Sequence, residues 1–200
     1  MVASGVHVRA GNAMDRTRRA LLTGAARAVA EHGVRGTSMQ AIAAAAGVAK
    51  GTLYNHFRTK DDVLRALLHS ELDRLADLAS PLPPEQALAA LADELGGHPV
   101  LRRLREREPA ALAGLVGAGQ EEWAALTSRV AATLRIDPDS AELAARWLLG
   151  VVLQPGCPAD RHRQAARLTA ALGGDSEPGS AQGQGPGEHQ PVGPRSGVIG

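Results

Sequence analysis

AGVAKGTLYNHFRTK, residues 46–60, is the stretch of sequence that decides the fold. Gly47 can enter a left-handed turn without steric cost, and the residues on either side favour short helices, over 37–45 and 50–57. Two short helices joined by a tight turn that contains glycine are typical of a helix-turn-helix. Helical spacing predicts that Val48, Leu53 and Phe57 point inward. The predicted outward face carries hydrogen-bonding groups suited to phosphates and base edges, at Lys50, Thr52, Tyr54, Asn55 and His56.

Over residues 16–68 the sequence resembles the DNA-binding helices of the TetR family of bacterial transcriptional regulators. The resemblance rests on a set of residues that matches the family in order and without a gap: Gly47, Val48, Lys50, Gly51, Thr52, Leu53, Tyr54, His56, Phe57 and Lys60. Ala49 departs from the pattern, because the family usually has a small polar residue there that caps the helix. Loss of such a cap costs about 1 kcal/mol.

The resemblance implies that the second short helix enters the major groove of double-stranded DNA. Tyr54, His56 and Lys60 would bind the phosphate backbone, and the other polar side chains of the helix would face base edges or nearby phosphates. From the preceding helix, Thr37 would contact a phosphate and Gln40 would lie at the groove edge. The candidate DNA-binding residues are therefore Thr37, Gln40, Lys50, Gly51, Thr52, Tyr54, Asn55, His56 and Lys60.

Positive charge is concentrated in the same part of the chain. From Asp15 to Lys60 there are eight cations and two anions, a net charge of +6, which leaves −5 for the rest of a chain whose total is +1. Both lysines of the protein, Lys50 and Lys60, fall in the motif. A basic module joined to a mildly acidic one is the pattern expected of a DNA reader with a separate control domain.

Composition predicts an all-α protein. Alanine and leucine favour helices, aromatic residues make up only 2% of the chain, and strand-like alternation is scarce. The single cysteine, Cys157, cannot form an internal disulfide, which fits a reducing cytoplasm. Neither a signal peptide nor the roughly 20 apolar residues of a membrane span can be recognised. We therefore expect a cytoplasmic protein.

The chain divides into four expected segments. Residues 1–13 would be a disordered leader, or would precede a true start at Met14. Residues 14–62 would form a three-helix DNA-binding domain, with Asp15 capping the first helix, Gly33 ending it, and Thr37 and Gln40 forming a capping box for the second. Residues 63–173 would form a helical ligand-binding and dimerisation domain. Residues 174–200, rich in Gly, Pro, Ser and Gln, would be a disordered tail.

In the second domain, Thr59 and Asp62 form a capping pattern for a long helix that ends before Pro81. Five further helices are expected over 85–95, 99–107, 109–134, 138–153 and 160–172. Trp combines an apolar face with an N–H group, so the candidate pocket residues are Gln120, Trp123 and Trp147. The helix over 141–152 is apolar almost all round, so it is either fully buried or half of a dimer seam. The resemblance implies that the last two helices form that seam, and its predicted residues are Leu143, Trp147, Leu148, Val151 and Leu168. The alternative is that both tryptophans belong to the core or the seam.

These patterns favour a homodimeric repressor that a small-molecule effector releases from a near-palindromic operator. An activator, or a constitutive DNA binder whose helical body only dimerises, remains the alternative. No cofactor or metal site is predicted, because the histidines are scattered without ligand spacing. An all-α enzyme is disfavoured because paired carboxylates and a nucleophile–base pair are missing. Cys157 precedes His162 by five residues, which is not a dyad spacing, and a thiol redox switch stays open.

Overall fold

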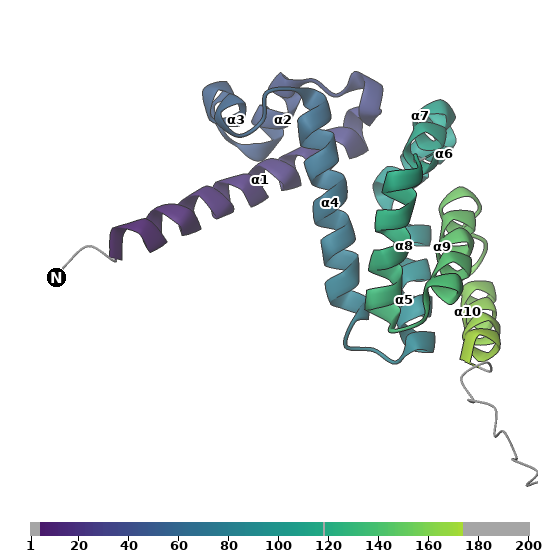
Figure 1. Ribbon diagram of the computed structural model, residues 1–200. Coiled ribbons are helices and arrows are strands. Elements are labelled where there is room, and N and C mark those ends of the chain that lie inside the picture. Colours follow the sequence, from purple (N-terminus) through teal and green to yellow (C-terminus); the bar gives the residue numbers. More distant parts are fainter. Residues whose placement is uncertain (1–4, 118, 174–200) are drawn as a thin grey trace, which may run out of the picture.

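A computed structural model of the protein describes residues 5–117 and 119–173. Within these residues the chain forms ten α-helices and no strand, which confirms the predicted all-α class (Figure 1). The helices are α1 Gly5–Gly36, α2 Met39–Ala46, α3 Lys50–His56, α4 Lys60–Ala79, α5 Pro84–Gly97, α6 Pro99–Arg107, α7 Pro109–Val116, α8 Gln120–Leu134, α9 Pro138–Leu153 and α10 Pro158–Gly173. The predicted tail over 174–200 and residues 1–4 of the predicted leader lie outside the described residues.

Helices α1 to α3 and the start of α4 form a head with its own apolar core. Leu21 of α1, Ile42 of α2 and Leu53 of α3 are fully buried there, together with Val63 at the start of α4. Gly47 turns the chain between α2 and α3 with a φ of 68° and a ψ of 29°, the predicted left-handed conformation. The helix-turn-helix is thus held by residues whose inward direction the sequence predicts.

The start of α1 differs from the prediction. Helix α1 begins at Gly5, so residues 5–13 are helical rather than a leader, and Asp15 lies inside the helix instead of capping it. No proline interrupts residues 5–15, which allows the helix to continue upstream. The predicted end is confirmed, because Gly33 has non-helical angles, with a φ of 79° and a ψ of 173°.

The start of α2 also differs. Ser38 rather than Thr37 is the N-cap, since its Oγ accepts the N–H of Ala41 at 3.1 Å. The predicted capping box of Thr37 and Gln40 is therefore wrong. By contrast, the capping box that opens α4 is confirmed, with Thr59 and Asp62 exchanging two hydrogen bonds at 3.0 and 3.1 Å.

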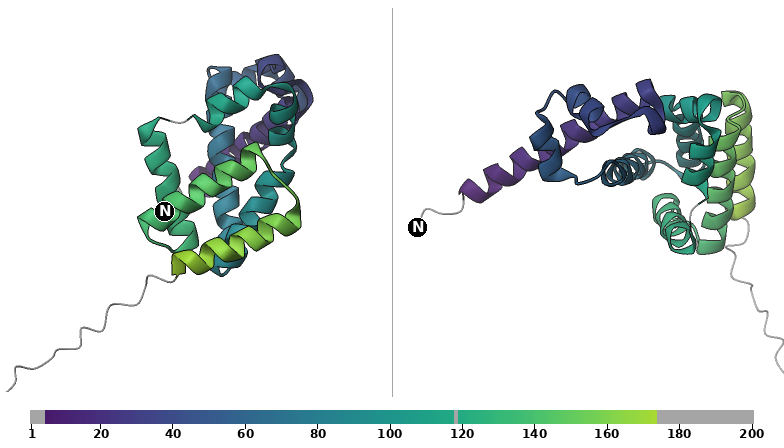
Figure 2. Two further views of the ribbon diagram at one scale, coloured as in Figure 1. Left: turned by 90° about the vertical axis from the view of Figure 1, so that its right-hand side faces the viewer. Right: turned by 90° about the horizontal axis from the view of Figure 1, so that it is seen from above.

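The body comprises α5 to α10 and the C-terminal part of α4. Helix α5 lies at its centre and packs against α4, α9 and α10, and its Leu88 is fully buried. The helix predicted over 109–134 is two helices, α7 and α8, separated at residues 117–119, where Gly117 and Gly119 lower helix propensity. Figure 2 shows α9 and α10 side by side on the face of the body that points away from the head.

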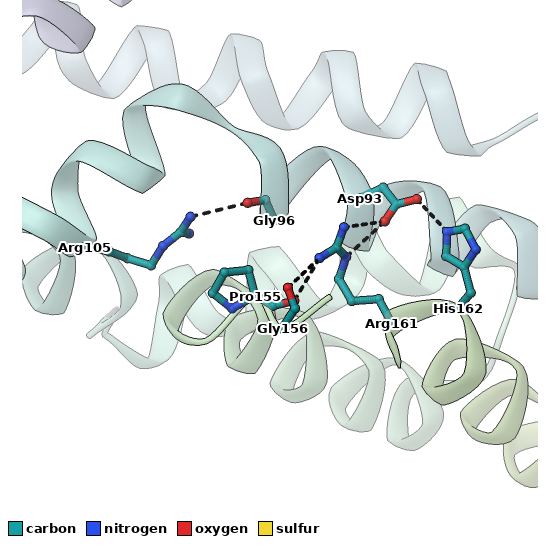
Figure 3. Close-up of polar contacts among 7 residues, drawn as sticks. All are labelled: Asp93, Gly96, Arg105, Pro155, Gly156, Arg161 and His162. Carbon is teal, nitrogen blue, oxygen red and sulfur yellow. Dashed lines mark hydrogen bonds and ion pairs between the residues drawn. The ribbon is translucent and has the colours of Figure 1, made fainter. Parts of the chain in front are cut away.

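Two arginines fix the helices on this face (Figure 3). The guanidinium of Arg161 in α10 donates to Asp93 of α5 and to the carbonyls of Pro155 and Gly156 in the turn after α9. Arg105 of α6 donates to the carbonyl of Gly96 and to that of Val152 at the end of α9. Gly96 and Val152 lie in the last turns of α5 and α9, where carbonyls lack partners within the helix, so Arg105 satisfies groups that these helices leave open.

Candidate nucleic-acid interface

Helix α3 has one buried and one exposed face. Leu53 is fully buried and Phe57, which follows the helix, is 5% exposed, so these two side chains anchor α3 to α1 and α2. On the opposite side Lys50, Tyr54 and Asn55 are exposed. The Nζ of Lys50 lies 5.7 Å from the centroid of the Tyr54 ring, a cation–π contact between neighbours one helical turn apart.

The remaining candidates on α3 lie at the edge of this face. Gly51 is exposed, and the side chains of Thr52 and His56 are half-buried. Ala49 is the N-cap of α3, has extended backbone angles and supplies no side-chain hydrogen bond, as its departure from the family pattern predicts. The structure therefore brings a cation, a phenol and an amide together at the surface, with a hydroxyl and an imidazole beside them. Such a face can donate to phosphates and can donate to and accept from base edges.

Three candidates lie outside α3. Gln40 is exposed on α2. Thr37 is 3% exposed, and its hydroxyl donates to the carbonyl of Gly33 at 2.5 Å, so it is an interior residue of the head and presents no hydroxyl at the surface. The Nζ of Lys60 donates to the carbonyl of Val34 at 3.1 Å. Sequence spacing alone does not reveal these two partner carbonyls, because Gly33 and Val34 both belong to the turn at the end of α1.

The cations of α1 add to the basic character of the head. The guanidinium of Arg18 lies 4.8 Å from the centroid of the Phe57 ring, and Arg27 donates to the carbonyl of Ala45 at the end of α2. Asp62 carries negative charge at the start of α4, where hydrogen bonds from Thr59 lower the pKa of its carboxyl below the ordinary value.

A cleft of about 650 Å³ opens between α1 and α4 and is lined by residues of both helices, including Arg18.

The residues predicted to line a ligand pocket do not contribute to this cleft. Gln120 is exposed at the start of α8. Trp123 is half-buried against the body core, with the guanidinium of Arg146 at 5.2 Å from its ring. The Nε1 of Trp147 donates to the side chain of Gln164 in α10 at 3.1 Å. Their role in ligand binding stays a prediction.

The predicted dimer seam divides into two groups. Leu148 and Val151 are 7% and 4% exposed and pack inside the body core, so their side chains are not available at the surface. Leu143 is 53% exposed, whereas Trp147 and Leu168 are half-buried and pack against the body core. A helix that is apolar on all sides gives no hydrophobic direction, which is why the sequence does not separate the two groups.

Residues 21–67, which include the whole helix-turn-helix, match the family described as "Bacterial regulatory proteins, tetR family". This part of the chain is therefore a DNA-binding domain of the TetR type. It is 30% identical over 136 residues to the HTH-type transcriptional repressor Rv1474c of Mycobacterium tuberculosis, a match that covers 64% of this chain and 60% of that protein. The chain thus spans about three fifths of this relative's length.

Solved structures share the TetR-family fold. A TetR-family transcriptional regulator from Pectobacterium atrosepticum has a TM-score of 0.57 at 22% identity, over 80% of this chain and 94% of that chain. The transcriptional regulator FadR from Bacillus subtilis, in complex with stearoyl-CoA, has a TM-score of 0.50 at 16% identity, over 77% of this chain and 96% of that chain. No helix in the described part of the chain is long and apolar enough to cross a membrane.

Proposed function

We propose that this TetR-family protein is a homodimeric transcriptional repressor that binds double-stranded DNA through α3 and is released by a small-molecule effector. The observation that carries the proposal is the exposed face of α3, where Lys50, Tyr54 and Asn55 stand opposite the buried Leu53. Repression is supported by the Rv1474c relative, which is a transcriptional repressor. A repressor of this kind acts in the cytoplasm, where the bacterial chromosome lies.

Asn55 is the base reader in this proposal, because a side-chain amide can pair with the edge of an adenine through two hydrogen bonds. Tyr54 and Lys50 contact the phosphates, and the positive charge of the head supplies most of the sequence-independent affinity. Lys60 contributes to DNA binding indirectly, because its ammonium group donates to the carbonyl of Val34 and so holds the turn at the end of α1.

The dimer is proposed to form through the outer side of α9 and α10. Leu143 and Leu153 are large exposed apolar residues on α9, and Figure 2 shows α9 and α10 on the face of the body that points away from the head. A twofold interface would pair this surface with itself. We expect Leu143→Arg to yield a monomer by sedimentation, whereas Leu78→Arg, at an exposed leucine of α4, leaves the dimer intact.

The DNA-binding part is tested by enrichment from a random double-stranded library with the purified full chain. The expected product is a motif with twofold symmetry and half-sites about 10 bp apart from centre to centre. Its affinity should fall steeply with salt, with a slope of about −0.9 per phosphate contact. Enrichment of no symmetric motif, or a salt slope near zero, contradicts the proposal.

Effector release is supported by a structural neighbour, since FadR from Bacillus subtilis was crystallised with stearoyl-CoA. The alternative is a constitutive DNA binder or an activator whose body only dimerises. The cleft between α1 and α4 is lined by neither Trp123 nor Trp147. A screen of metabolites and acyl-CoA thioesters against the operator complex separates the two: release by a compound supports the repressor, and none supports the alternative.

A further inference from the structure

Residues 33–37 form the turn at the end of α1, beyond the break at Gly33, and join the head to the body. Val34 packs against an apolar cluster of the body that includes Leu101 and Leu104 of α6. From the head side, Lys60 donates to the carbonyl of Val34 and Thr37 donates to that of Gly33. The turn is therefore held simultaneously by the start of α4 and by α6, which makes it the place where the angle of the head is set.

One carboxylate of the body holds this turn directly. Glu108, between α6 and α7, accepts the backbone N–H of Arg35 through its Oε2 at 3.1 Å. Its Oε1 fills the space in which a side chain at Gly33 would lie, because a Cβ built there would stand 1.5 Å from that oxygen. Gly33 is thus required twice, for its φ of 79° and for the approach of the carboxylate.

A second polar group lies beside Gly33 at this joint. The Nε of Arg103 in α6 lies 3.3 Å from the same Cβ position at Gly33. This nitrogen is buried and has no hydrogen-bond partner among the described residues. A movement of α6 that passes Glu108 from the amide of Arg35 to Arg103 would satisfy this donor and free the turn.

We propose that Glu108 is a positioning residue for the DNA-binding head: it holds the turn after α1 against α6 and so fixes the direction in which α3 is presented. The proposal rests on the proposed function, since it assigns a role in DNA recognition. It predicts that Glu108 governs how strictly the two heads of a dimer match the spacing of two half-sites, while each half-site is still read by α3.

The test uses the full chain and the motif that the wild-type protein enriches from random DNA, with the half-site spacing varied by one and two base pairs. We expect Glu108→Ala to reduce the preference for the best spacing about tenfold, the effect of losing one hydrogen bond to a charged acceptor. The same variant should speed hydrogen exchange of the Arg35 amide about tenfold. Glu108→Gln, which keeps an acceptor, should retain most of both properties.

Two controls separate positioning from general damage. Glu106→Ala removes an exposed carboxylate of α6 and should change neither property. Arg103→Leu removes a half-buried side chain from the same joint without removing the bond to Arg35, so the spacing preference should persist. Gly33→Ala should reproduce the loss seen in Glu108→Ala, and its effect should not add to that loss in the double variant.

Each outcome decides one of the two proposals. If the wild-type chain enriches no symmetric motif, the proposed function fails, whatever Glu108 does. If the motif is found but Glu108→Ala keeps the wild-type spacing preference, or Arg103→Leu loses it equally, the positioning role of Glu108 is overturned and packing alone sets the head.

Discussion

The pair formed by Asp93 and Arg161 offers a sharp test of what holds the body together (Figure 3). The side chain of Arg161 is 8% exposed, and its Nε and Nη2 donate to Oδ1 of Asp93 at 3.0 and 2.7 Å. The other oxygen, Oδ2, lies 2.6 Å from Nε2 of His162. Asp93→Ala would leave the Arg161 charge inside the protein with only the carbonyls of Pro155 and Gly156 as partners.

The cost follows from the unpaired charge. Removing one partner of a buried pair destabilises a protein by about 3 to 5 kcal/mol, and we expect about 3 because Asp93 itself is partly exposed. For a chain of this size, that corresponds to a fall in Tm of about 6 to 12 °C. Glu142→Ala removes an exposed partner of Arg146 on α9 and should cost about 0.5 kcal/mol or less.

Urea denaturation followed by tryptophan fluorescence measures this cost in the body. Both tryptophans of the chain, Trp123 and Trp147, lie there, so the signal reports unfolding of the body and not of the head. An Asp93→Ala variant that loses less than about 1 kcal/mol would refute the reasoning, because it would show that Arg161 finds water or another partner. The Glu142→Ala control shows whether the loss of any carboxylate lowers the free energy of unfolding.

The same pair predicts a dependence on pH. Burial raises the pKa of Asp93, but hydrogen bonds from His162 and Arg161 outweigh burial and leave it below the ordinary value of 3.8. A carboxyl with a lowered pKa stabilises the folded state above its unfolded pKa, and this contribution disappears as the pH falls through the folded pKa. The difference in free energy of unfolding between wild type and Asp93→Ala should therefore be full at neutral pH and should narrow below about pH 4.

Three further predictions concern the N-cap of α3, the histidine at the start of α6 and the exposed face of α3. Ala49→Ser should stabilise the head by about 0.5 to 1 kcal/mol in thermal unfolding, because it supplies the missing cap of α3. Burial lowers the pKa of His98 below 6.5, so the free energy of unfolding of the wild type should decrease as the pH falls below that value. His98→Gln should not show this decrease. Urea denaturation of both proteins at pH 7.5 and at pH 5.5 makes the comparison. Tyr54→Phe should weaken binding to all DNA sequences alike, whereas Asn55→Ala should change the preferred sequence; binding profiles with the reverse pattern contradict this assignment.

Local sequence signals predicted the head well. The turn at Gly47, the capping box of Thr59 and Asp62, and the inward direction of Leu53 and Phe57 are all set by neighbours within four residues. The N-cap of α2 was predicted wrongly because Thr37 and Ser38 both offer a hydroxyl. The tertiary turn at Gly33 takes the hydroxyl of Thr37, which leaves the cap to Ser38.

Long-range polar contacts could not be predicted. Glu108 meets the amide of Arg35 across 73 positions, and Arg161 meets Asp93 across 68, with no pattern of charge that marks either pair in the sequence. The sequence also could not predict that Leu143 is exposed whereas Leu148 is buried. This difference depends on where α8 and α5 cover α9, which only the tertiary packing of the body decides.

The composition of the core explains why such polar contacts matter here. Seven of the thirteen buried residues of the main body cluster are alanine. Alanine side chains let helices approach closely, but they interlock less than large side chains do and therefore constrain crossing angles weakly. Hydrogen bonds are directional, so contacts such as those of Arg161 and Glu108 can select one arrangement among several that bury similar apolar area. Under the proposed function, two heads match the spacing of two half-sites, so the helix angles would determine binding, and charged side chains far from α3 would set those angles.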